Sequence, residues 1–348
     1  MAANTISLIC AFDVWQDGTA VPVQEEWPTA KKPEGASYRW LHFDLGETEL
    51  LTWLRENLPD AAAEAMVQQE TRPRCDSIGK GMILNLRGVN LNPGSEPEDM
   101  VSLRLWICDG LILSARRRKV FAVDQIRQDI VDGKPPSTAE AFLATLAHGL
   151  SKRIEQTSLH FVEETDLLEE MSSELAAGLN DTLSTLRQSV IKVRRFVRPQ
   201  SEALTDLAMG EIWALDPDSK VQLSEAVNRA KRTVEELDST VERLLAIRDH
   251  LDVLHSLALG RNSYVLSVVA AIFLPLGFLT GLLGINVGGI PLQDSNYGFL
   301  VVAIGTVLIG VVLYLVFRFA KWLYEPDRVY RRGFSSYSAA RVTVFRLS

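Results

Sequence analysis

YVLSVVAAIFLPLGFLTGLL, residues Tyr264–Leu283, carries no charged side chain and runs directly into the tripeptide Gly284-Ile285-Asn286. A second apolar run, Phe299–Phe317, meets Arg318 only as it ends. A helix of about 20 residues, rising about 1.5 Å per residue, is long enough to cross the hydrocarbon core of a bilayer. The two runs therefore predict a transmembrane hairpin. The residues before about Asn262 are polar enough to form a large soluble region.

The composition fits a soluble acidic region attached to a short membrane part. The chain has 348 residues, a formal net charge of -8 and a mean hydropathy of +0.06, which is too polar for a transporter built from many membrane helices. The start, MAANTISLICAFDVW, lacks a basic segment and is interrupted by Asp13, so we expect no cleaved signal. Cys10, Cys75 and Cys108 have no CxxC spacing, which predicts neither a disulfide framework nor a thiolate zinc site.

Lysine and arginine are distributed unevenly around the apolar runs. The segment between the runs, 285–298, contains neither residue, whereas the region after the second run carries Arg318, Lys321, Arg328, Arg331 and Arg332. Cytoplasmic flanks of membrane helices are enriched in these cations. We therefore expect both termini to lie in the cytoplasm and the short loop to lie outside.

The patterns along the chain divide it into seven parts. We predict a cytoplasmic α/β domain at 1–136, an acidic helical region at 137–215, a stalk helix at 216–262, a first transmembrane helix at 263–284, an external loop at 285–298, a second transmembrane helix at 299–319 and a basic cytoplasmic tail at 320–348. The first boundary follows a Gly-Lys-Pro-Pro break at 133–136.

Short β-rich and helical stretches alternate before this break. The stretches predicted as strands are LICAFDVW, RWLHFDL, GMILNLRGV, VSLRLWICDGLILSAR and KVFAVD, and those predicted as helices are LLTWLRENL, AAAEAMVQQ and 124–132. This mixture predicts an α/β fold for the first domain.

The helical period dominates after the break. Ser137 or Thr138 is expected to cap an acidic amphipathic helix, and a second helix from about Asp181 is expected to bend at Pro199. Asp216-Pro217-Asp218 is a further start signal, after which no strong breaker occurs before the first apolar run. One long helix is therefore predicted to continue from the stalk into the bilayer.

A lone hairpin has no interior, so an aqueous pore would need several copies around an axis. Small or hydroxylated residues recur at helical spacing on one face of the first membrane helix, with Leu274 as a hydrophobic constriction among them; the candidate pore-lining residues are Ser263, Ser267, Ala270, Leu274 and Gly277. Gly277 and Gly281 also form a small-xxx-small pair, which is typical of close helix packing. The pattern leaves pore lining and packing both open.

Other functional classes find less support. No Asp, Glu or His lies within the apolar runs, so a direct proton relay through the bilayer is not indicated. Gly79-Lys80-Gly81 is not a phosphate-binding loop, and no nucleophile has a positioned base, so we predict no enzyme and no cofactor. The basic run 116–119 is interpreted as a strand end or salt-bridge site, and no nucleic-acid partner is expected.

The hairpin resembles that of a known family. Asn262-Ser263-Tyr264, Phe273-Leu274-Pro275-Leu276, Gly281 and Gly284-Ile285-Asn286 are similar to the signature of CorA-type divalent cation channels, whose mark is Gly-Met-Asn. Ile285 stands in place of the methionine, and the sequence VGGIP follows at 287–291. These features resemble the ZntB-like zinc-transporting branch of the family.

The resemblance implies a CorA-like funnel-shaped homopentamer with the first membrane helix of each copy around the axis. The motif Gly284, Ile285 and Asn286 would then be the selectivity motif, with five Asn286 carboxamides at the external mouth. A neutral carbonyl oxygen can accept a hydrogen bond from the water shell of a divalent ion. It binds the ion less tightly than a ring of carboxylates would, so the ion can leave again. A helix C-cap is the other role open to Asn286.

Two aspartates and two histidines are candidates for further sites. Asp294 in the external loop is either a cation attractor or a turn residue. Asp249 lies on the small-residue stripe below the membrane, where the resemblance makes it a candidate cytoplasmic cation site; a solvated stalk charge is the alternative. His250 and His255 are about 140° apart on a helix, so one copy cannot present both to a single ion, and no site of direct metal ligands is predicted.

The resulting hypothesis is a zinc transporter that moves hydrated Zn²⁺, with Mg²⁺, Co²⁺, Ni²⁺ and Cd²⁺ as other possible cargo. Its expected partners are copies of itself, membrane lipid and divalent cations. A magnesium, cobalt or nickel channel of the CorA type is the alternative within transport. A membrane-tethered sensor or scaffold is the alternative of another class. The resemblance implies a transporter of the bacterial inner membrane.

Overall fold

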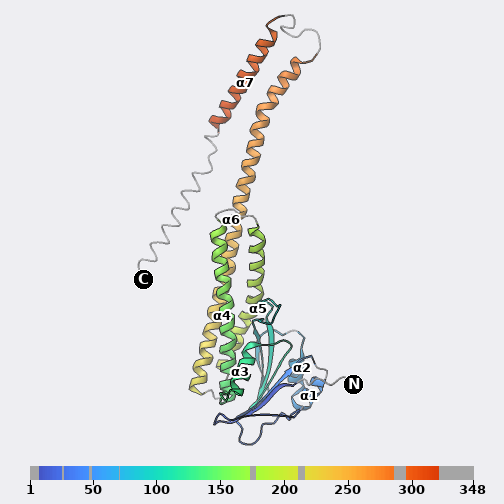
Figure 1. Cartoon of the computed structure of the whole chain (residues 1–348), viewed down its shortest axis with the longest axis vertical. Coiled ribbons are helices and arrows are strands. Elements are labelled where there is room, and N and C mark those ends of the chain that lie inside the picture. Colours follow the sequence, from blue (N-terminus) through green and yellow to red (C-terminus); the bar gives the residue numbers. More distant parts are fainter. Residues whose placement is uncertain are drawn as a thin grey trace, which may run out of the picture. The chain divides into compact units, whose positions relative to one another are not determined.

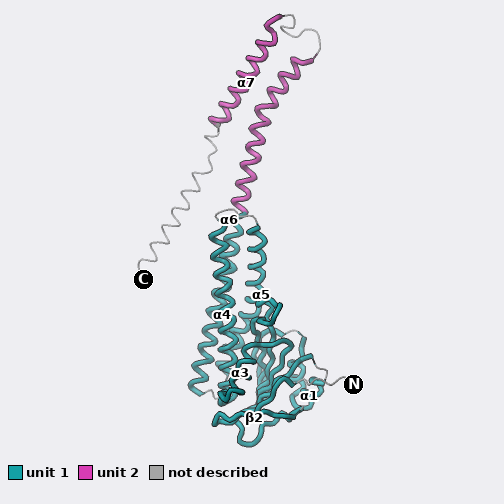
Figure 2. Tube along the Cα trace, in the orientation of Figure 1, with its two compact units in different colours: residues 1–251 teal, residues 252–348 magenta. Residues whose placement is uncertain are grey.

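The computed structural model divides into two compact units, Met1–Leu251 and Asp252–Ser348 (Figure 2). The boundary falls inside one uninterrupted helix, α6, which spans Pro217–Leu283. The residues that the structure describes are 8–25, 27–46, 49–69, 71–172, 178–210, 216–285 and 295–320.

Unit 1 is built on a mixed sheet of seven strands (Figure 1). The strands lie in the order β2-β1-β3-β7-β6-β5-β4, and every neighbouring pair is antiparallel except β3 and β7. Their bounds are β1 Leu8–Val14, β2 Ala20–Pro22, β3 Tyr38–Asp44, β4 Arg74–Ile78, β5 Gly81–Gly88, β6 Val101–Cys108 and β7 Leu111–Arg116. The α/β fold class predicted from the sequence is confirmed.

Helices cover both faces of this sheet. Because side chains alternate along a strand, Trp40 of β3 packs into the core beneath α3 (Phe121–Val131) and α4 (Ala139–Ser172), whereas its neighbour Leu41 packs on the opposite side. That opposite side is covered by α1 (Glu49–Asn57) and α2 (Asp60–Val67). The first domain therefore has three layers with an apolar core on each side of the sheet.

Four of the five stretches predicted as strands are strands, and VSLRLWICDGLILSAR forms the hairpin β6–β7. Asp109 and Gly110 close that hairpin with φ of 46° and 79°, as a two-residue turn of the primed type requires. The prediction for KVFAVD is wrong, because Phe121 begins α3. Val123 and Ile126 are buried at helical spacing, and a short apolar run such as 120–123 does not by itself distinguish a strand from the start of a helix.

Three long helices follow the break at 133–136. The amide of Ala141 donates to Thr138 Oγ1 at 3.1 Å, and the amide of Ser219 donates to Asp216 Oδ1 at 2.9 Å, so both predicted helix starts are confirmed. The second helix, α5 (Leu179–Met209), continues through Pro199. In unit 1, α4, α5 and α6 share one apolar core that includes Phe161, Val190, Val193, Leu237 and Leu244.

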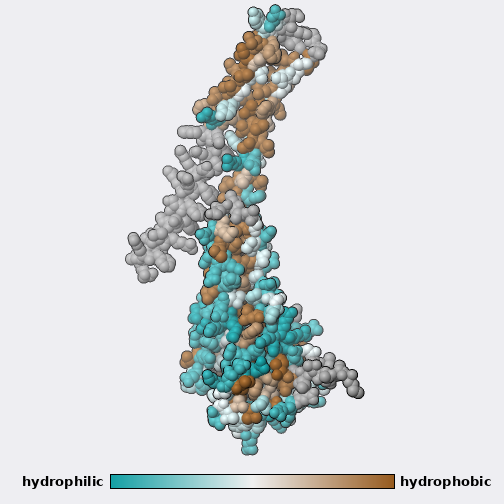
Figure 3. Space-filling view, in the orientation of Figure 1, coloured by the Kyte–Doolittle hydropathy of each residue, from teal (hydrophilic) through white to brown (hydrophobic). Residues whose placement is uncertain are grey.

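Unit 2 consists of the C-terminal part of α6 and α7 (Gly298–Ala320) in its described residues. Both helices are long and apolar enough to cross a membrane, judged by length and composition. Hydrophobic residues cover most of their surface, whereas hydrophilic residues dominate the surface of unit 1 (Figure 3). This contrast agrees with the predicted soluble region and membrane hairpin.

A buried histidine sits in the sheet of unit 1. His42 Nδ1 lies 2.7 Å from Ser114 Oγ, and its Nε2 accepts a hydrogen bond from Arg116 Nε at 3.0 Å. Since a guanidinium only donates, the proton of the neutral ring is on Nδ1. Burial, assisted by the positive charge of Arg116, lowers the pKa of His42 from 6.5 to about 3.

The substitution His42→Gln is expected to flatten the dependence of stability on pH. Below pH 6.5 the unfolded chain binds a proton on His42 that the folded chain does not bind. The free energy of unfolding therefore falls by about 1.4 kcal/mol for each pH unit, down to the folded pKa of about 3. Urea unfolding of the full chain at pH 7, 6 and 5, followed by tryptophan fluorescence, measures this loss. His160→Gln, at an exposed position, is the control. Equal losses in the wild type and His42→Gln would refute the assignment.

Candidate ion path

Half-buried residues gather on one face of the membrane part of α6. They recur every three or four positions: Tyr264, Val268, Ala271, Ile272, Pro275, Leu276 and Leu279. A β-carbon on Gly310 of α7 would lie 3.7 Å from Leu276 Cδ1, which places the two helices in contact there.

The predicted small-residue stripe lies on a different face. Every member of it is exposed in the chain: Ser263, Ser267, Ala270, Leu274 and Gly277. Leu274 is 74% exposed, and a β-carbon on Gly277 or Gly281 would meet no atom within 4 Å. The stripe is centred roughly 140° around the helix from the face that meets α7, taking about 100° per residue. Packing within the hairpin thus leaves the stripe uncovered.

The hydroxyl groups of the stripe retain acceptor capacity. Ser267 Oγ donates its proton to the carbonyl oxygen of Ser263 at 2.9 Å, as serine commonly does inside a helix. The lone pairs of Ser267 Oγ are then left for donors outside the helix. Water molecules around a cation are such donors, so the stripe can contact a hydrated ion without a charged group.

The helix ends at the predicted selectivity motif. The Gly284 amide donates to the carbonyl oxygens of Thr280 and Gly281, at 3.0 and 3.2 Å, and this closes the last turn of α6. Ile285 is 51% exposed. Asn286 and Asp294 lie outside the described residues, so their proposed roles rest on the sequence.

Several carboxylates on the long helices of unit 1 form ion pairs with arginines of a neighbouring helix. Arg243 of α6 donates to Asp166 Oδ1 and Glu169 Oε2 of α4, each at 2.5 Å. Asp238 of α6 pairs with Arg194 and Arg198 of α5. Sequence analysis did not identify these pairs, because it cannot tell which faces of three long helices meet. Asp249 is exposed on α6, so its carboxylate is accessible to solvent ions.

The described residues contain no group of three or more His, Cys, Asp or Glu side chains that could hold a metal ion. Both ring nitrogens of His42 are already used inside the sheet. Burial raises the pKa of Cys10 to about 12 and that of Cys75 to about 11, so these thiols stay protonated. The uncovered stripe of α6 is therefore the feature that best fits the handling of a hydrated ion.

Comparisons with known proteins show which family this chain is similar to. The family model for the CorA-like Mg2+ transporter protein matches residues 35–321. The divalent cation transporter CmaX of Pseudomonas aeruginosa is 36% identical over 290 residues, covering 82% of this chain and 87% of CmaX. The zinc transport protein ZntB of Pectobacterium atrosepticum is 32% identical over 287 residues, covering 82% and 88%. The structure of full-length CmaX superposes with a TM-score of 0.79 at 32% identity, covering 92% of this chain and all of that one.

Proposed function

This chain belongs to the CorA-like Mg2+ transporter family and is a divalent cation transporter of that family, and on this premise we propose that it moves hydrated Zn²⁺ across the bacterial inner membrane. The pore would be formed by copies of the chain, five according to the resemblance, with α6 of each copy around the axis. Both termini would lie in the cytoplasm, which the lysine and arginine bias supports.

The exposed stripe on α6 is the observation that carries the proposal. Since α7 covers another face, the stripe of Ser263, Ser267, Ala270, Leu274 and Gly277 is available to surround an axis when copies assemble. Its small and hydroxylated members leave room for a water shell, and Leu274 would form the narrowest apolar ring. Asn286 would form the ring at the external mouth.

Zinc is favoured over magnesium by two sequence features. Ile285 stands where the resemblance has methionine, and two glycines follow at 288 and 289. The relative from Pectobacterium atrosepticum, a zinc transport protein, supports the same choice. Uptake of zinc by proteoliposomes that is little affected by a large excess of magnesium would agree with it, and uptake selective for magnesium would overturn it.

Asp249→Asn is expected to lower zinc flux a few-fold at low ionic strength and much less at high salt. An exposed carboxylate concentrates cations through its field, and salt screens that field over a Debye length of about 8–10 Å at 0.1–0.15 M. Flux into proteoliposomes at two salt concentrations measures the effect. Glu202→Gln removes an exposed carboxylate of α5 and should change little. An equal loss in both variants, or a loss independent of salt, would remove Asp249 from the ion path.

A further inference from the structure

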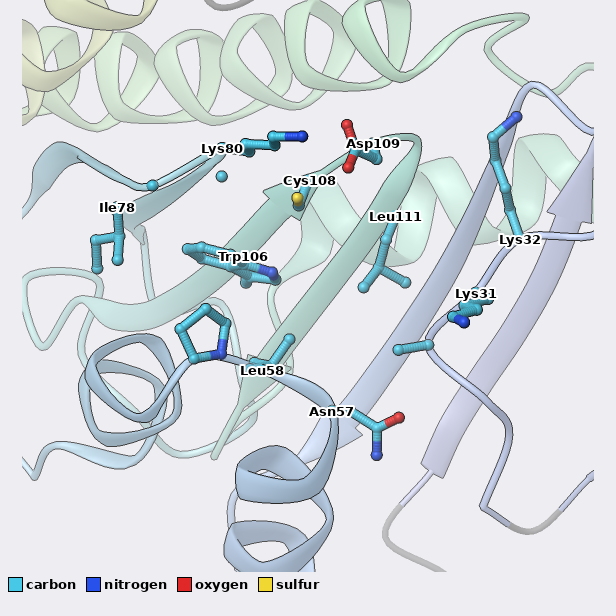
Figure 4. Close-up of a pocket in the computed structure, with 14 residues that line it drawn as sticks. Lys31, Lys32, Asn57, Leu58, Ile78, Lys80, Trp106, Cys108, Asp109 and Leu111 are labelled. Atoms are coloured by element: carbon cyan, nitrogen blue, oxygen red, sulfur yellow. The ribbon is translucent and has the colours of Figure 1, made fainter.

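A pocket of about 580 Å³ lies in unit 1, at the end of the sheet where the β4–β5 and β6–β7 hairpins turn (Figure 4). The last residue of α1, Asn57, and the Leu58-Pro59 turn close it from the helical layer. The loop around Lys31 closes it from the side of β3. Pockets of about 300–1,000 Å³ are typical of small-molecule sites.

The floor of this pocket is apolar and well fixed. Leu58, Trp106 and Leu111 line it and are no more than 7% exposed. A β-carbon at position 81 would lie 2.3 Å from the ring of Trp106, so the indole rests directly against the backbone of Gly81. This close approach fixes the position of the Trp106 ring in the wall of the pocket.

The rim is positively charged in a chain that is acidic overall. Three lysines and one aspartate line the pocket, Lys31, Lys32, Lys80 and Asp109, which gives a formal charge of 3 − 1 = +2. Lys32 Nζ donates to the carbonyl oxygen of Ala36 at 2.5 Å and is committed to its own loop. Lys31 and Lys80 are exposed and form no ion pair with any residue that the structure describes. Lys80 extends above Cys108 toward Asp109 (Figure 4).

We propose that this pocket binds a small organic anion. The apolar body of the ligand fills the hollow lined by Leu58, Trp106 and Leu111, and its carboxylate or phosphate lies at the rim near Lys31 and Lys80. The charge of the rim complements an anion, and the floor offers only apolar contact to the rest of the ligand. The proposal is independent of the transport function, because every lining residue belongs to unit 1.

The test uses three probes that share one ring system: 1-naphthoate, 1-naphthyl phosphate and neutral 1-naphthol. Isothermal titration calorimetry on the full chain in lipid nanodiscs, with empty nanodiscs subtracted, measures their affinities. We expect both anions to bind about tenfold or more tightly than naphthol, and inorganic phosphate to bind more weakly than naphthyl phosphate. Naphthol that binds as tightly as the two anions would overturn the proposal.

Variants locate the site. The double substitution Lys31→Gln with Lys80→Gln should weaken binding of both anions about tenfold or more, whereas Lys152→Gln, at an exposed position on α4, should leave it unchanged. A second readout is alkylation by N-ethylmaleimide, quantified by mass spectrometry of the peptides. Bound naphthyl phosphate should slow alkylation of Cys108, which lines the pocket, in the wild type but much less in the double variant. Unchanged binding in the double variant, or equal protection of Cys108 in both proteins, would contradict this site.

Discussion

Asn286→Ala is expected to reduce zinc flux by about tenfold or more. Each copy in the proposed ring would lose a carbonyl oxygen that accepts a hydrogen bond from the water shell of the entering ion. The lost hydrogen bonds of all the copies act on the same ion, so their energies add. A total loss of about 1.4 kcal/mol in the stabilisation of the entering ion already lowers the flux tenfold. Uptake of radioactive zinc by proteoliposomes containing equal amounts of protein measures the effect.

Two variants separate the proposed role of Asn286 from a general disturbance of the segment. Asn286→Gln keeps the carboxamide and should retain more flux than Asn286→Ala. Val287→Ala alters the next residue without touching the amide and should behave like the wild type. If Asn286→Ala transports zinc at the wild-type rate, the motif asparagine is not in the path, and a hairpin that only tethers unit 1 to the membrane gains support.

Ser267→Leu is expected to abolish most zinc flux, whereas Val269→Leu is expected to leave it nearly unchanged. The two positions are about 200° apart on α6, and both are exposed in the chain. A leucine at 267 would place one bulky apolar side chain per copy around the proposed axis and remove the hydroxyl acceptor. A leucine at 269 would add one methylene to a side chain that is 47% exposed and lies on the side of α6 nearer Leu276, away from the stripe.

The same flux assay compares the two variants, after size-exclusion chromatography has shown that both elute like the wild type. Substantial flux through Ser267→Leu would show that this face does not surround the ion. Equal loss in the two variants would point to a general sensitivity of the helix to added volume.

Local pattern was sufficient for most elements of the fold. Alternation in RWLHFDL predicted β3, and Asp216 followed by Pro217 predicted the start of α6, because both signals depend on neighbouring residues alone. The prediction of a strand at KVFAVD failed because four consecutive apolar residues fit a strand and the first turn of a helix equally well. The weakly patterned β4 was not predicted, because its pairing with β5 is a tertiary contact.

The candidate site was less accessible to sequence analysis. The stripe on α6 could be found by helical spacing, but whether α7 covers it depends on how the two helices pair. Contact at Leu276 and Gly310 answers that question for the single chain. The ion pairs of Arg243 and Asp238 likewise needed the arrangement of α4, α5 and α6. A pore needs several copies of the chain around one axis, and the residue pattern of a single chain does not specify that arrangement.

Chemical modification of single cysteines tests most directly whether water and ions meet the stripe. In a chain with Cys10, Cys75 and Cys108 replaced by serine, Ser267→Cys and Val269→Cys would be treated with a charged, membrane-impermeant methanethiosulfonate reagent during zinc flux. We predict that the reagent blocks flux through Ser267→Cys, and that prior zinc slows the block, while Val269→Cys is unaffected. A Ser267→Cys protein that transports zinc but is never blocked, beside a Val269→Cys protein that is, would contradict the proposed ion path.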